Sequence, residues 1–320
     1  RGAMGLGAAL IAPSALSMLF GTFGSRPHEL GKALAFFGAA APAGGTAGVF
    51  LGGVITEWMD WRWTFLINIP VGLLVLAVTS SLLPAGIRRG GRLDIIGALV
   101  VTAAMVIGVY GVVTAPDTGW GSTRTISLLG GAAGLLAAFV VIEGVQKEPL
   151  VRLGIFRAPN LSAGNIAMAL LGAAWIPLWF FLNLYLQQVL GYGAFESGLA
   201  LLPMTGAIML LMVAATGRLT AIFGIKLNIA AGMVFLVAAL LLLAQTPTDG
   251  EFLLHLLPAS LLAAVGMSLA YIPAMIASTA SAPTEDSGLA SGLVSTTYQV
   301  GSALGLAAMT AVAQSYTEGT

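Results

Sequence analysis

The chain consists largely of apolar segments about 20 residues long, the length that a helix needs to cross a lipid bilayer. Short connections that hold most of the charged residues separate these segments. Gly and Pro inside several segments do not count against helices, because membrane helices tolerate them. The sequence therefore predicts an all-α fold, a polytopic bundle of transmembrane helices. We expect ten spans, at residues 1–20, 33–55, 63–83, 95–114, 125–142, 160–187, 197–216, 227–245, 252–276 and 288–313.

The composition excludes other classes of protein. Among 320 residues, 58% are hydrophobic and 8% are charged, whereas a soluble domain carries about a quarter charged residues. Thirteen basic residues balance thirteen acidic ones, so the chain has no basic surface for nucleic acid. The absence of cysteine excludes disulfides, thiolate metal sites and cysteine nucleophiles, and two histidines are too few for a histidine-based metal centre. We expect no cofactor, and we expect the lipid bilayer to surround the chain.

The basic residues predict the orientation of the spans, because cytoplasmic connections of membrane proteins are enriched in Lys and Arg. If the start of the first span lies outside, ten basic residues fall in inner connections and only two, Arg62 and Arg124, fall in outer ones. The ten are Arg26, Lys32, Arg88, Arg89, Arg92, Lys147, Arg152, Arg157, Arg218 and Lys226. The opposite orientation would invert this ratio. The sequence therefore predicts a multi-pass protein of the cell (inner) membrane.

Arg1 opens the chain and runs directly into an apolar segment. Because the first residue is not Met and no signal region precedes the first span, we interpret the chain as an internal piece of a longer protein. An arginine at membrane depth normally faces a cavity or a partner. Alternatively, Arg1 sits at the outer interface and extends its side chain toward water.

The polar chemistry of the spans gives no support for an enzyme. All thirteen carboxylates lie in connections or at span ends. No nucleophile stands beside a base, no cluster of metal ligands is present, and no Gly-rich loop precedes a lysine that could bind phosphate. We therefore predict a chain without catalytic residues.

A stripe of glycines marks the second span. Gly44, Gly48 and Gly52 recur every four residues and so share one face of a helix. Small residues at this spacing allow a neighbouring helix to approach closely. The face is either a specialised contact or an instance of ordinary packing between membrane helices.

Polar and aromatic side chains mark one face of the sixth span. Trp175, Trp179, Asn183 and Gln187 stand four residues apart. Such a stripe can line a cavity for a bulky apolar ligand, with the amides fixing its orientation; alternatively, it forms hydrogen bonds between helices. Further cavity candidates are Tyr271 in the ninth span and Tyr298 and Gln299 in the tenth.

The chain contains an internal repeat with an offset of 257 residues. Shifting the second span by this offset places Gly44 on Gly301 and Gly48 on Gly305. It also places Glu29 on Asp286. Parallel repeats of this kind build transporters with two halves.

Several motifs together resemble the major facilitator superfamily, in particular its fourteen-helix (EmrB/QacA-like) branch of drug:proton antiporters. The motifs are R-G-A-M-G-L-G-A-A at Arg1–Ala9, G-V-F-L-G-G at Gly48–Gly53, W-R-W-T-F-L-I-N-I-P-V-G at Trp61–Gly72, E-P-L-V-R-L-G-I-F-R at Glu148–Arg157, Q-Q-V-L-G-Y at Gln187–Tyr192 and S-G-L-A-L-L-P at Ser197–Pro203. Two positions depart from the family pattern: Met4 stands where Gln is usual, and Val49 where Pro is usual.

The resemblance implies that this piece covers the fourth to the thirteenth helix. Residues 1–83 would be the remainder of an N-terminal bundle, 84–158 two extra linker helices, and 159–320 a C-terminal bundle without its last helix. It also implies that Gly44, Gly48, Gly52 and Gly53 form the packing face of the antiporter motif and that Arg1 helps to control the coupling proton. The coupling carboxylate itself would lie in the missing leading helices.

The implied function is proton-driven export of hydrophobic or amphipathic compounds by alternating access. Its partners would be small substrates of that kind and protons. Two other readings stay open at this point: a facilitator of one specific solute without proton antiport, and a membrane receptor that does not transport.

Overall fold

The computed structural model describes residues 2–82, 94–146, 148–247, 250–279, 282 and 286–317. These residues form helices, and none of them forms a β-strand. The elements are α1 (Gly2–Phe23), α2 (Pro27–Trp58), α3 (Trp63–Leu66), α4 (Asn68–Leu82), α5 (Ile95–Thr118), α6 (Thr123–Val145), η1 (Leu153–Arg157), α7 (Leu161–Leu184), η2 (Tyr185–Val189), α8 (Ala194–Leu211), η3 (Met212–Thr216), α9 (Gly217–Ala244), η4 (Phe252–Leu256), α10 (Leu257–Thr279) and α11 (Ser287–Thr317).

Helices occupy all ten predicted span positions. Within the described residues, seven helices are long and apolar enough to cross a membrane, and Trp63–Thr79 forms a shorter apolar helix. One of the seven, Ala194–Ala244, contains two predicted spans. The chain reverses inside it at Gly224, whose φ of 78° and ψ of 166° suit glycine because no Cβ is present to clash. The amide of Asn228 donates to the carbonyls of Leu219 and Gly224 and so fastens this reversal.

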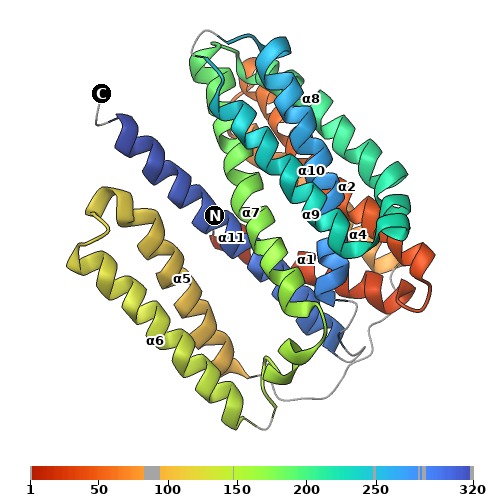
Figure 1. Cartoon of the computed structure of the whole chain (residues 1–320), viewed down its shortest axis with the longest axis vertical. Coiled ribbons are helices and arrows are strands. Elements are labelled where there is room, and N and C mark those ends of the chain that lie inside the picture. Colours follow the sequence, from red (N-terminus) through yellow and green to blue (C-terminus); the bar gives the residue numbers. More distant parts are fainter. Residues whose placement is uncertain are drawn as a thin grey trace.

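The helices pack around α10, which lies against α7, α8 and α9. In Figure 1, α2 runs beside α8, and α11 runs beside α7. The hairpin of α5 and α6 lies at the side of this bundle, where α5 packs on α11 (Figure 1). Buried leucines and methionines of α2, α7 and α8, including Leu34, Leu171 and Met204, form the core.

The outer surface of the bundle is apolar. Leu74 on α4, Leu99 on α5 and Leu241 on α9 are all more than half exposed. In water such a surface would drive aggregation, whereas in a bilayer it is the surface that lipid tails contact. The exposed leucines therefore agree with the membrane fold that the sequence predicts.

Glycines allow the closest helix crossings. A Cβ atom on Gly301 would overlap the backbone of Ala169, and one on Gly305 would overlap the backbone of Ala173. On the opposite helix, a Cβ on Gly172 would overlap the carbonyl of Tyr298. Small residues let helix backbones touch in this way where lipid supplies no hydrophobic driving force. The glycines of the repeat in the tenth span thus lie at the crossing of α7 and α11.

The turn between α5 and α6 has clear local causes. α5 ends at Gly119, whose φ is 88°. Ser122 then caps α6, because its side chain accepts a hydrogen bond from the backbone N–H of Thr125 over 3.2 Å. A side-chain acceptor at this position satisfies one of the free N–H groups at a helix start.

Thiol labelling tests the predicted orientation. Gly121, before α6, and Gly154, in η1 after it, are both exposed and have no atom within 4 Å of a Cβ position. In intact cells we expect an impermeant thiol reagent to modify Gly121→Cys and to leave Gly154→Cys unmodified, because α6 places the two residues on opposite sides of the membrane. The chain has no native cysteine that would add background. Labelling of Gly154→Cys alone would invert the orientation.

Candidate functional site

A cavity of about 430 Å³ lies where α2 meets α7, α10 and α11. Among the described residues that line it, five side chains are aromatic and none is charged. The lining residues are Gly38, Ala41, Pro42, Gly45, Trp175, Ile176, Trp179, Phe180, Asn183, Met267, Tyr271 and Tyr298. Apolar walls with a few polar groups are typical of sites for small organic ligands.

Three of the four members of the predicted stripe on α7 line this cavity: Trp175, Trp179 and Asn183. The fourth, Gln187, is exposed on η2, and its Nε2 donates to Oδ1 of Asn183 over 3.2 Å. Gln187 therefore orients Asn183 rather than lining the cavity. Gln187 does not line the cavity because the helix changes to π geometry at Tyr185. This change rotates the side chains that follow away from the face of α7.

The indole nitrogen of Trp179 is buried and has no hydrogen-bond acceptor among the described residues. A buried donor without a partner costs about 1–3 kcal/mol. The alternative hypothesis is that this stripe forms hydrogen bonds between helices. At Trp179 the described helices provide no such bond. The position of the residue in the cavity lining favours the ligand-binding reading.

Tyr271 on α10 and Tyr298 on α11 form an edge-to-face pair in the cavity wall. Their ring centroids are 5.8 Å apart and their planes are inclined by 84°. This geometry is the favoured one for aromatic pairs. Gln299, the next residue on α11, is exposed and lies outside the lining, because neighbouring residues on a helix point about 100° apart.

The fourth wall of the cavity comes from α2, whose lining residues were not among the predicted site residues. Gly38, Pro42 and Gly45 line the cavity at intervals of four and three residues, which is the spacing of one helix face. A Cβ on Gly38 would lie 3.4 Å from the ring of Tyr271. The spacing of these small residues is visible in the sequence, but the same helix carries a second stripe of glycines, and spacing alone does not show which stripe lines a cavity.

That second stripe does not form the predicted contact within the described part of the chain. No atom of the described residues lies within 4 Å of a Cβ position on Gly44, Gly48 or Gly52. The face of α2 that meets α8 instead carries Thr46, whose hydroxyl bonds that of Thr205. Thr46 stands two residues from both Gly44 and Gly48, which is about 200° around a helix. The stripe therefore points away from α8.

Gly53 does make the close contact expected of it. A Cβ at this position would lie 2.8 Å from backbone atoms of Ala194 and Phe195, at the start of α8. One turn away, a Cβ on Gly198 would lie 2.9 Å from the Cα of Phe50. The rings of Phe50 and Phe195 are 5.2 Å apart beside these contacts. The two helices thus touch backbone to backbone at this end.

Arg1 lies outside the described residues, so the structure does not place the basic group that the sequence assigned to proton control. The described residues that line the cavity include no basic or acidic side chain. The role of Arg1 stays a prediction.

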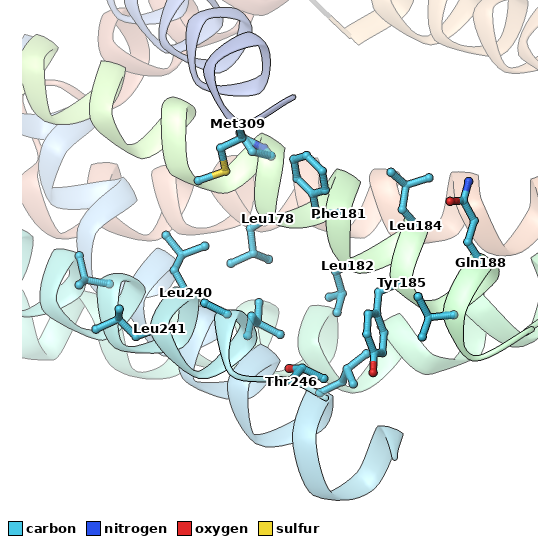
Figure 2. A pocket seen from close by; sticks show the side chains of 16 residues that line it. Leu178, Phe181, Leu182, Leu184, Tyr185, Gln188, Leu240, Leu241, Thr246 and Met309 are labelled. Atoms are coloured by element: carbon cyan, nitrogen blue, oxygen red, sulfur yellow. The ribbon is translucent and has the colours of Figure 1, made fainter. Parts of the chain in front are cut away.

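A second cavity, of about 710 Å³, lies between α7, η2, α9, η4 and α11. Figure 2 shows Leu178, Leu182 and Leu240 among the side chains that line it, with Tyr185 and Thr246 at one end. The hydroxyl of Tyr185 donates to the carbonyl of Pro247. None of the described site residues predicted from the sequence lines this cavity, because its leucines resemble those of any lipid-facing segment in the sequence.

Residues 1–306 match the family described as the Major Facilitator Superfamily. The chain belongs to this superfamily. Membership confirms the family resemblance, and it agrees with the all-α fold and the several membrane-spanning helices of the described residues.

Several relatives in the superfamily are named for drug export or resistance. The cephamycin export protein CmcT of Amycolatopsis lactamdurans is 35% identical over 100% of this chain and 66% of its own length. The puromycin resistance protein pur8 of Streptomyces alboniger is 34% identical over 98% of this chain and 62% of its own. The multidrug resistance protein Stp of Mycobacterium tuberculosis is 31% identical over 98% and 58%. The chain therefore spans about 58–66% of the length of these relatives.

Proposed function

We propose that the protein exports hydrophobic or amphipathic small molecules by alternating access, with the aromatic cavity between α2, α7, α10 and α11 as the substrate site. The lack of charge among the described residues that line this cavity is the observation that carries the proposal, since apolar compounds bind most favourably where no charge must be desolvated. The names of the relatives, which refer to antibiotic export and resistance, support it.

The position of the cavity fits alternating access. α2 belongs to the predicted N-terminal bundle, and the other three helices belong to the predicted C-terminal bundle. In two-halved transporters the substrate site lies at the interface of the halves, which rock about it. A ligand in this cavity would contact both bundles and would respond to their relative motion.

Proton coupling is part of the proposal. A coupling group must bind and release a proton, and Asp, Glu and His are the usual choices in transporters. None of the described residues that line the cavity is of this kind. We therefore place the coupling group elsewhere in the protein. Collapse of the proton gradient should stop export; export that continues without the gradient would favour the facilitator reading.

Alanine substitution in the cavity tests the site. We expect Trp179→Ala and Asn183→Ala to change the relative export rates of different compounds by about two- to tenfold, because an aromatic contact and a hydrogen bond each contribute roughly 0.5–1.5 kcal/mol. Export of a panel of compounds, normalised to protein level, measures the effect. Trp120→Ala, at an exposed tryptophan in the α5–α6 turn, is the matched control. An unchanged substrate profile in both cavity variants would contradict the assignment.

A further inference from the structure

Two carboxyl groups meet at the open end of the α5–α6 hairpin. Asp94 precedes α5 and caps it, and Glu143 lies in the last turn of α6. The two side chains are 9% and 4% exposed. Acidic side chains are rarely buried to this extent unless something compensates their charge. The pair therefore needs a physical explanation.

Half of the four carboxyl oxygens are satisfied by N–H donors. Oδ1 of Asp94 accepts from the backbone N–H of Gly97 over 2.9 Å and from the side-chain amide of Gln146 over 3.0 Å. Oε2 of Glu143 accepts from the backbone N–H of Val151 over 2.7 Å. These bonds tie the start of α5 to the end of α6 and to the connection that leads to α7.

The other two oxygens, Oδ2 of Asp94 and Oε1 of Glu143, are buried and have no hydrogen-bond donor among the described residues. Both lie directly against Gly97, where a Cβ atom would overlap each of them. The two oxygens thus occupy one small space. Two ionised carboxylates cannot both be accommodated there, because like charges at such a distance repel and each oxygen would stay unsatisfied.

We propose that a single proton is held between Oδ2 of Asp94 and Oε1 of Glu143, so that the two residues form an acid–carboxylate pair. One proton satisfies both orphan oxygens at once and removes one of the two charges. Buried carboxyl pairs that share a proton in this way are known from acid proteases.

Glu143 is the member that carries the proton. Asp94 has two N–H donors and stands at the N-terminus of α5, where the helix dipole favours negative charge. The Gly97 amide, which donates to the carboxylate, lowers the pKa of Asp94 below its ordinary value. The Glu143 hydroxyl therefore donates, and the Asp94 carboxylate accepts.

A metal cation does not fit the same space. Calcium and magnesium need about six or more oxygen ligands, and no group of three or more His, Cys, Asp or Glu residues occurs among the described residues. The groups nearest the pair are N–H donors, which repel a cation. A proton is the ligand that this geometry accepts.

The shared proton fastens the hairpin at the end opposite its turn. The connection that follows α6 also carries Glu148 and Arg152, and Arg152 is paired with Asp286, directly before α11, over 3.4 Å. At high pH the proton leaves, and the two carboxylates repel each other. The hydrogen bond that joins α5 to α6 at the open end of the hairpin is therefore lost as the pH rises.

Infrared spectroscopy of the purified protein detects the proton directly. We expect the C=O stretch of one protonated carboxyl group at neutral pH, shifted in heavy water. Both Glu143→Gln and Asp94→Asn should remove the band, because an amide then donates in place of the acid. Glu251→Gln, at an exposed residue, should leave it intact. Absence of the band in the parent, or its persistence in both amide variants, would overturn the proposal.

Thermal unfolding provides a second measurement. Between neutral and high pH the parent should lose at least roughly 2 °C more in Tm than Glu143→Gln, because the amide donates at every pH. If one amide variant fails to fold, the other gives the same comparison. Parallel pH profiles in the parent and the variants, or a Tm that rises on adding sodium or calcium instead, would also overturn the shared proton.

Discussion

Export should fall by about fivefold or more when Gly198 is replaced by leucine, since overpacking costs roughly 1–3 kcal/mol and about 1.4 kcal/mol is a factor of ten. A Cβ at this position would already lie 2.9 Å from the Cα of Phe50. The leucine would hold α2 and α8 apart at the end where Gly53 also touches the start of α8. The two bundles could then no longer close against each other there.

Gly206→Leu is the matched control for this prediction. Gly206 lies on the same helix, is exposed, and has no atom within 4 Å of its Cβ position. We expect it to retain export at the parental level, so that any loss in Gly198→Leu cannot come from helix propensity or membrane insertion alone. Both variants should be compared at equal protein level in the membrane. Normal export with leucine at Gly198 would show that this contact has no part in transport.

Replacing Gly301 with leucine should lower the melting temperature of the protein as well as its transport activity. The backbone of Ala169 occupies the space that any side chain at Gly301 would need. Separating α7 from α11 disturbs the crossing that also positions Tyr298 in the cavity wall. Overpacking of roughly 1–3 kcal/mol corresponds to a fall in Tm of about 2–12 °C for a chain of this class.

Gly292→Leu is the corresponding control on α11, because no atom lies within 4 Å of its Cβ position. Thermal unfolding of the purified proteins should show the Gly301 variant melting earlier and the Gly292 variant melting with the parent. Equal melting temperatures for all three proteins would mean that α7 and α11 accommodate a leucine at their crossing without a loss of stability.

The sequence indicated which residues of α7 line the cavity, but it did not indicate those of α2. On α7, the residues Trp175, Trp179 and Asn183 are large or polar in an otherwise apolar helix. Their spacing of four residues therefore indicated which face of α7 lines the cavity. On α2 two faces carry small residues, and spacing alone could not show which of them meets a neighbour. The structure places Gly38, Pro42 and Gly45 at the cavity, whereas a Cβ added at Gly44, Gly48 or Gly52 would meet no described neighbour within 4 Å.

By itself, the sequence determined where the described membrane helices lie along the chain, because the apolar length that spans a bilayer is a local property of the chain. It also determined the family, through motifs of neighbouring residues. Only the tertiary structure decided which faces touch. The meeting of Asp94 with Glu143, the backbone contact of Gly198 with Phe50, and the pairing of Tyr271 with Tyr298 all join helices that are separate in the sequence. Such contacts depend on how rigid helices rotate and cross when packed, which hydrophobicity does not encode.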